Sequence, residues 1–185
     1  MAHYKLPRFV PVSIKKATLF RGKYWHEHVP SNIELRYLNG PSYHAYIPRV
    51  RHAFETRDRD TLWLSFTPGD LIKHTHAVWT RCLRRGKHVF QEALEQRGLD
   101  RDGRRLVLDD KGKVIEKQPG ITGSLQITLG AGFPRATREE MLEQAGLILR
   151  HVQYIHYQHR QSGDIKPDET KKPQKERKSE SQPTP

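Results

Sequence analysis

The residues with the widest chemical range lie in "KHTHAVWTRCLRRGKHVF", residues 73–90. This stretch holds three histidines and five lysines or arginines, and it contains no acidic residue. Imidazoles bind metals and transfer protons, and guanidinium groups bind phosphate oxygens through a planar fork of donors. The stretch could therefore be a metal-binding cluster, a basic helix for a polyanion, or an ordinary amphipathic helix.

Helical geometry separates these interpretations. The sequence predicts one helix over 70–97, with Thr67 as N-cap, proline in its first turn and Gly98 as its stop. A helix advances about 100° per residue. On such a helix His74 and His76 would point well apart, so the pair could not chelate one ion. The metal interpretation therefore fails if these residues are helical.

The same helix is predicted to be amphipathic. The apolar side would consist of Ile72, Trp79, Cys82, Leu83, Gly86, Val89, Phe90, Ala93 and Leu94. The opposite side would carry His74, Arg81, Arg84, Arg85 and His88. Contact of the three arginines with phosphate is one hypothesis, and a merely solvated basic face or salt bridges to an acidic partner protein are the alternatives. Cys82 is expected to be a buried apolar residue and not a nucleophile.

A second candidate site is "FRGKYWHEHV", residues 20–29, where aromatic and basic residues interleave. Arg21, Lys23, Tyr24 and Trp25 could form a stacking platform with charged flanks, as in binders of single-stranded nucleic acid. The alternative is an ordinary β-hairpin with aromatic cross-strand packing.

Histidines outside the central helix offer two further kinds of chemistry. His26 and His28 are two positions apart, so on a strand they would share a face and could share a metal. A third ligand would have to come from His44 or His52, and no local spacing supports one. We therefore predict no metal and no cofactor. A small nuclease using His26, His44 or His52 remains an alternative, with a metal or with a cation such as Arg49 or Arg51.

The last long helix is predicted over about 138–160, opened by a capping box of Thr137 and Glu140. Its outer side carries Arg150, Tyr154 and Tyr157, which is unusually apolar for a solvated helix face. We expect an interface there, either with a second copy of the chain, with another protein, or with nucleobases.

The charge of the chain favours an anionic partner. The formal net charge is +12, and most of the excess lies in residues 1–100 rather than in the C-terminal segment. A basic globular body raises the local concentration of phosphate groups. The single cysteine excludes an intrachain disulfide, and no signal peptide or membrane-spanning run is evident, so we expect a cytoplasmic protein.

The pattern of elements predicts an α+β fold. Two N-terminal β-hairpins are expected, one turning at 21–23 and one joining strands 32–38 and 42–47 through Asn39-Gly40. A short helix over 49–56, a strand over 61–66, a hairpin turning at 109–112 and a strand over 123–130 complete the set.

These elements predict one compact domain over residues 1–161, with a β-rich lobe (8–66) and a helix–hairpin–helix lobe (67–161) as an alternative subdivision. The segment 162–185 is rich in Lys, Glu, Ser and Pro and is predicted to be a disordered tail.

The sequence thus favours a non-enzymatic DNA- or RNA-binding accessory protein. The basic face of the central helix and the aromatic and basic N-terminal hairpin would together form one electropositive surface. A histidine-dependent nuclease and a protein docking its basic face on an acidic partner are the alternatives.

Overall fold

The protein has an α+β fold, as predicted. The computed structural model describes residues 9–12, 14, 16–39, 45–109 and 114–164. In chain order the elements are β1 (Val10–Val12), β2 (Phe20–Trp25), α1 (Asn32–Leu38), α2 (Ile47–Thr56), β3 (Leu62–Thr67), the 3₁₀ turn η1 (Gly69–Lys73), α3 (His76–Glu95), β4 (Arg105–Leu108), β5 (Val114–Gln118), β6 (Gly123–Leu129), the 3₁₀ turn η2 (Phe133–Arg135) and α4 (Arg138–Asp164). None of the helices in the described part of the chain is long and apolar enough to cross a membrane.

The described strands form a four-stranded sheet in the order β1-β2-β6-β3 and a separate two-stranded sheet of β4 and β5. In the larger sheet, β6 pairs antiparallel with β2 and parallel with β3. Strands from both predicted lobes, 8–66 and 67–161, therefore share one sheet.

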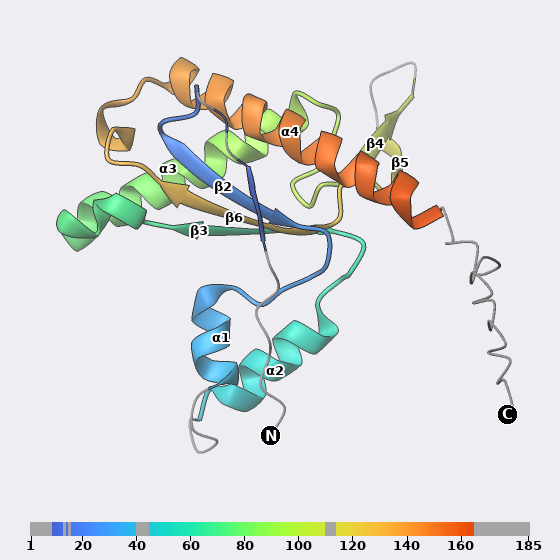
Figure 1. Cartoon of the computed structure of the whole chain (residues 1–185), viewed down its shortest axis with the longest axis horizontal. Helices are drawn as coiled ribbons and strands as arrows, with labels where there is room; N and C mark the ends of the chain where they lie inside the picture. The colour runs from blue at the N-terminus through green and yellow to red at the C-terminus, as the bar shows by residue number, and fades with distance from the viewer. Residues whose placement is uncertain (1–8, 13, 15, 40–44, 110–113, 165–185) are drawn as a thin grey trace, which may run out of the picture.

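Helices α3 and α4 pack on one face of the large sheet and cross it above β2 and β6 (Figure 1). The core between these layers contains Phe20 of β2, Phe90 of α3 and Ile148 of α4, each 0–1% exposed. The rings of Phe20 and Phe90 meet edge to face, with their centroids 5.0 Å apart. Burial of these side chains removes apolar surface from water and fixes the sheet against its two helices.

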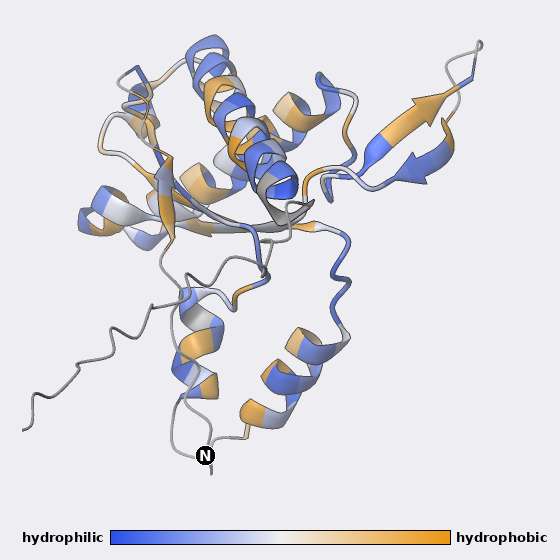
Figure 2. Ribbon diagram, turned by 45° about the vertical axis from the view of Figure 1, so that its right-hand side comes forward, coloured by the Kyte–Doolittle hydropathy of each residue, from blue (hydrophilic) through white to orange (hydrophobic). Residues whose placement is uncertain are grey.

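Helices α1 and α2 lie on the other side of the sheet, below it in Figure 1. The β4–β5 hairpin projects away from the body of the molecule (Figure 2). This hairpin carries three apolar side chains that are at least half exposed, Leu108, Val114 and Ile115.

Residues 32–38 form helix α1, so the prediction of a strand there was wrong. The Ser31 side chain accepts a hydrogen bond from the Glu34 backbone N–H, and the Glu34 carboxylate accepts one from the Ser31 N–H. This capping box was visible in the sequence as S-x-x-E, and it outweighs the alternation of apolar residues that favoured a strand. The partner strand predicted over 42–47 lies outside the described residues at 42–44, and Ile47 begins α2.

The turn predicted at 21–23 was also wrong, because β2 runs through it as one strand. A Cβ on Gly22 would lie 3.1 Å from Val12 Cβ and 3.4 Å from Ile148 Cγ2. Glycine is therefore used here for close packing between the sheet edge and α4, and not for a turn.

The long helix predicted over 70–97 is divided in two, and Thr75, not Thr67, precedes α3. Gly69 has φ +55°, and a Cβ there would lie 2.5 Å from the Leu129 carbonyl oxygen. This backbone ends β3 and starts η1, which leaves Ile72 69% exposed instead of in the apolar stripe. The rest of the stripe is confirmed, including buried Cys82, and Gly98 ends the helix with φ +69°.

The strands and the long helix predicted for the C-terminal half are confirmed, whereas 110–112 of the predicted hairpin turn lie outside the described residues. Strands β4 and β5 pair antiparallel, and β6 forms where expected. Thr137 and Glu140 make the reciprocal hydrogen bonds of a capping box at the start of α4. The helix continues to Asp164, so residues 162–164 of the predicted tail are helical, and 165–185 lie outside the described residues.

Candidate nucleic-acid interface

The face of the sheet opposite α3 and α4 carries three rows of side chains, set by the strand register. The first row is Trp25, Ser124 and Trp63. The segment leading into α1 and α2 closes this row. Ser124 Oγ accepts a hydrogen bond of 2.8 Å from the Val29 N–H, and Phe54 of α2 packs edge to face on Trp63 at 5.4 Å.

Trp63 shows how completely the first row is covered. The Arg57 and Arg59 guanidinium groups lie 4.4 and 4.9 Å from the centroid of its indole ring. Its Nε1–H donates to the Asp58 carbonyl at 2.9 Å, and the residue is only 3% exposed. Cation–π contacts of this kind stabilise the link between α2 and β3. They also leave no ring face of Trp63 for a ligand.

No described α-helix lies above the other two rows, and we call them the open rows; the 3₁₀ turn η1 packs against Thr128 at their end. They consist of Pro11, Lys23, Gln126 and Ser65 in one row and Arg21, Thr128 and Thr67 in the other. Three of these seven side chains are well exposed, namely Pro11, Arg21 and Lys23. The remaining four are half-buried. None of the seven is acidic.

The polar groups of the open rows are organised along the strands. Arg21 Nη2 lies 3.0 Å from Asp70 Oδ2, in an exposed ion pair at the rim of the sheet. The hydroxyls of Thr67 and Thr128 lie 2.9 Å apart. Lys23 takes part in none of the ion pairs found among the described residues. The rows thus offer one lysine, one arginine and several neutral hydrogen-bonding groups on rigid strands.

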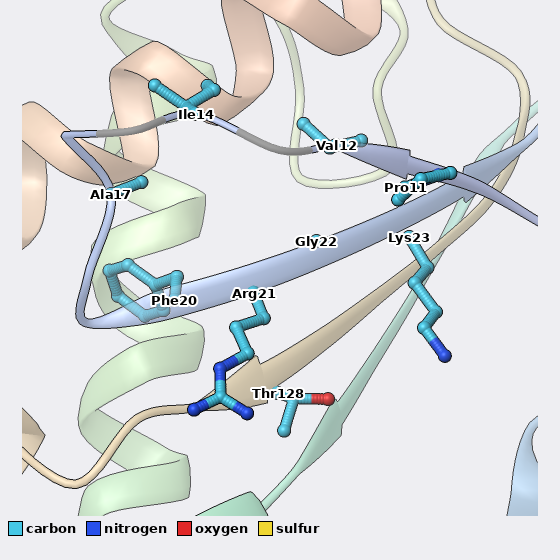
Figure 3. Close-up of a pocket in the computed structure, with 9 residues that line it drawn as sticks. All are labelled: Pro11, Val12, Ile14, Ala17, Phe20, Arg21, Gly22, Lys23 and Thr128. Atoms are coloured by element: carbon cyan, nitrogen blue, oxygen red, sulfur yellow. The ribbon is translucent and has the colours of Figure 1, made fainter.

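A cavity of about 460 Å³ lies at the edge of the open rows, where the chain leaves β1 and enters β2 (Figure 3). It is lined by Pro11, Val12, Ile14, Ala17, Phe20, Arg21, Gly22, Lys23 and Thr128. In Figure 3, Arg21, Lys23 and Thr128 lie together on the sheet, and Ile14 and Ala17 lie beyond the edge of β2. The cavity is therefore apolar on one side and cationic on the other.

The structure separates Arg21 and Lys23 from the aromatic residues predicted to act with them. Tyr24 points to the opposite face of the sheet and is 1% exposed, and its hydroxyl donates to the Thr122 carbonyl at 2.7 Å. Trp25 is half-buried and packs on the His26 ring at 4.6 Å. A stacking platform of Tyr24 and Trp25 is thus incompatible with the fold, because residues 21–25 alternate along one strand.

The predicted cations of α3 lie elsewhere. Arg81, Arg84 and His88 are exposed, and the stripe on the other side of α3 packs on the sheet, so these three side chains face away from it. His74 is also exposed, but it follows η1 and precedes α3. Arg85 is half-buried and donates a 2.9 Å hydrogen bond to the Ala136 carbonyl. The cations of α3 and those of the open rows therefore lie on opposite sides of the molecule, and they do not form one continuous surface.

The structure does not bring His26 and His28 together. The His26 ring stacks on His159 of α4 at 3.7 Å, whereas His28 Nε2 hydrogen-bonds the Thr61 carbonyl at 2.8 Å. Burial lowers the pKa of both imidazoles; nearby His159 lowers that of His26 further. Within the described part of the chain, no three His, Cys, Asp or Glu side chains are grouped to hold a metal ion.

The remaining histidines of the nuclease hypothesis are not assembled into a site either. His52 is exposed on α2, near Arg49 and Arg51 in sequence, and His44 lies outside the described residues. None of the described contacts joins His52 to His26 or His28.

A histidine contact holds β2 against the C-terminal half of α4. The Tyr24 hydroxyl lies 3.0 Å from His156 Nδ1. Burial lowers the pKa of His156, and the positive charges of Arg160, His159 and His26 lower it further. Burial also raises the pKa of Tyr24. Burial therefore favours the neutral form of both groups, which lie on the side of β2 opposite Lys23.

The outer side of α4 is exposed, as predicted. Arg150 is exposed, and Tyr154 and Tyr157 are 57% and 61% exposed. Sequence reasoning missed the polar residues of the open rows, Ser65, Thr67, Gln126 and Thr128. Their signal was the alternation of polar and apolar residues in "LWLSFT" and "SLQITL", which places them on one face of each strand.

Comparison of the chain with protein-family models, with curated proteins and with solved structures finds no match.

Proposed function

We propose that this protein binds nucleic acid without acting on it chemically, and that the open rows are its binding surface. The observation that carries this proposal is a sheet face with one lysine, one arginine, no carboxylate among its seven residues and no described α-helix covering it. The net charge of +12 supports an anionic partner.

The chemistry of the open rows suits a phosphate backbone. Arg21 and Lys23 would neutralise phosphates, and the hydroxyl group of Ser65 and the amide group of Gln126 would donate hydrogen bonds to phosphate or sugar oxygens. Strands hold these groups at fixed spacings, so little ordering entropy is lost on binding. Contacts of this type position a chain and carry little sequence information.

The test is a titration of labelled DNA and RNA oligonucleotides, single- and double-stranded, followed by fluorescence anisotropy at several salt concentrations. Each phosphate contact releases about 0.7 to 0.9 counterions, so two or three contacts predict roughly a tenfold loss of affinity between about 50 and 200 mM salt. Binding that does not depend on salt, or the absence of binding to every oligonucleotide, would defeat the proposal.

A protein partner is the second candidate, and the outer side of α4 favours it. Tyr154 and Tyr157 expose large amphipathic rings beside Arg150, and both residue types, tyrosine and arginine, are enriched at protein interfaces. Association that survives nuclease treatment and is lost in a Tyr154→Ser, Tyr157→Ser double variant would support this candidate. Capture that disappears with nuclease would leave nucleic acid as the partner.

A further inference from the structure

The cavity at the edge of β2 lies beside the open rows. It exists because β1 pairs with β2 only from Val10 to Val12, opposite Tyr24 to Gly22. Beyond that point the chain leaves the sheet and returns at Leu19, whose N–H donates a 2.9 Å hydrogen bond to Gln144 of α4. The wall opposite β2 is therefore anchored to the long helix.

Its lining defines the ligand. Val12, Ile14 and Ala17 line the cavity on one side of β2. Arg21 and Lys23 also line it, but their charged ends point away from these apolar residues, toward the open rows (Figure 3). Sites of about 300–1,000 Å³ with mostly apolar walls and a few polar groups are typical of small organic ligands, and a volume of about 460 Å³ falls in this range. A ligand that fits must combine an apolar or planar body with an adjoining anionic group.

We propose that this cavity takes one base of a single-stranded nucleic acid, while Arg21 and Lys23 hold the phosphates on either side of that base. This inference rests on the proposed function and adds to it the strandedness of the partner. A nucleotide unit has the required chemistry, because a planar base and a phosphate are joined through one sugar. The same strand would then continue across the open rows.

A duplex cannot make the same contact at low cost. Its bases are paired and stacked, and turning one out requires a few kcal/mol of unstacking and unpairing. Proteins that bind single strands commonly stack the bases on aromatic side chains. In this fold Trp63 is covered and Tyr24 is buried, so neither ring can do so. An apolar cavity is therefore the part of this surface that can distinguish a free base from a paired one.

The first test compares two strands of equal phosphate count. One is an oligothymidylate of about eight nucleotides, and the other has the same backbone with an abasic site at every position, both at the same salt concentration. We expect the intact strand to bind about tenfold more tightly, since one base contact is lost. Equal affinities would overturn the inference while leaving the proposed function standing.

The second test fills the cavity. Ala17→Leu adds bulk to the wall at a half-buried position, and Ala77→Leu makes the same change at an exposed position of α3. We expect Ala17→Leu to reduce the affinity for the oligothymidylate by about fivefold to tenfold and to leave the affinity for the abasic strand unchanged. Thermal unfolding of both variants checks that the fold is retained.

The outcomes separate the two proposals. Loss of binding to both strands in Ala17→Leu, or equal loss in Ala77→Leu, would overturn the assignment of the cavity. If neither strand binds the unmodified protein, the proposed function itself fails. If Ala17→Leu does not fold, Ile14→Phe replaces it, because Ile14 is half-buried and lines the same cavity.

Discussion

The open rows and the outer side of α3 are both cationic, yet they differ in what surrounds the charges. Arg21 and Lys23 stand on rigid strands among hydroxyl and amide groups, beside a cavity. Arg81 and Arg84 project from the outer side of helix α3. The neighbouring Arg85 is half-buried and donates a hydrogen bond to the Ala136 carbonyl. Arginines that are grouped in the sequence therefore need not share a surface with the other cations of the chain.

The largest expected effect comes from removing the cations of each surface in turn. Arg21→Gln with Lys23→Gln should reduce the affinity for single-stranded nucleic acid about tenfold to a hundredfold, since each charged hydrogen bond contributes about 1.5–3 kcal/mol and exposure reduces this. The matched control, Arg81→Gln with Arg84→Gln, removes the same charge from α3 and should change the affinity by less than about threefold. Fluorescence anisotropy at fixed salt measures both.

The reverse ranking of these two double variants would move the binding surface to α3. Equal losses would indicate a response to net charge alone, and the comparison between the surfaces would then have no basis.

Arg85 should behave as a structural residue. Arg85→Met keeps the apolar stem and removes the hydrogen bond to Ala136, so we expect the free energy of unfolding to fall by about 1 kcal/mol. The affinity for nucleic acid should stay within about twofold of the unmodified protein. Urea denaturation and anisotropy measure the two quantities. A large loss of affinity with unchanged stability would place Arg85 among the binding groups.

Removal of the Asp70 carboxylate should increase the affinity of the open rows for nucleic acid. Asp70→Asn breaks the exposed ion pair with Arg21 and removes the carboxylate at the rim of the open rows. Because such surface pairs contribute only about 0–1 kcal/mol, the affinity should rise about twofold to fivefold with little change in stability. Glu92→Gln, which breaks the exposed pair with Arg138, is the control and should leave binding unchanged. A weaker affinity in Asp70→Asn would argue against contact between Arg21 and phosphate.

The smallest expected effect is on the pH dependence of stability, and it concerns His156, which contacts Tyr24 of β2. The pKa of His156 is lowered in the folded protein, so the unfolded chain binds protons first as the pH falls below about 6.5. Stability is therefore fully present above that pH and is lost as the pH falls toward the lower, folded-state pKa.

This sign predicts a melting temperature that falls between about pH 7.5 and about pH 5.5, and a smaller fall in His156→Gln. His88→Gln, at an exposed position of α3, is the control and should follow the unmodified protein. A steeper fall in His156→Gln than in the unmodified protein would contradict the assignment.

Local patterns predicted much of the fold. The stripe from Cys82 to Leu94, the stop at Gly98 and the capping box at Thr137 follow from spacing within one segment, and all are confirmed. The insertion of β6 between β2 and β3 could not be predicted in this way. Pairing between strands about a hundred residues apart depends on which apolar faces fit together, and no local signal records that choice.

The same limit applies to the site. The exposure of Arg81 and Arg84 was predicted from the helical period, and the alternation of residues 20–25 would have placed Tyr24 in the core if Gly22 had been recognised as a packing glycine. Which face of the sheet stays uncovered depends on where α3, α4 and the α1–α2 pair dock. The open rows therefore became visible only in the assembled structure.

The most direct measurement of the central claim is a backbone amide NMR titration of the protein with an oligothymidylate at low salt. We predict that the largest shifts fall on the amides of β2, β6 and β3, around Lys23, Gln126 and Ser65. Residues around Arg81 and Arg84 on α3 should be nearly unaffected. Shifts concentrated on the outer side of α3, with the strands unchanged, would contradict this claim.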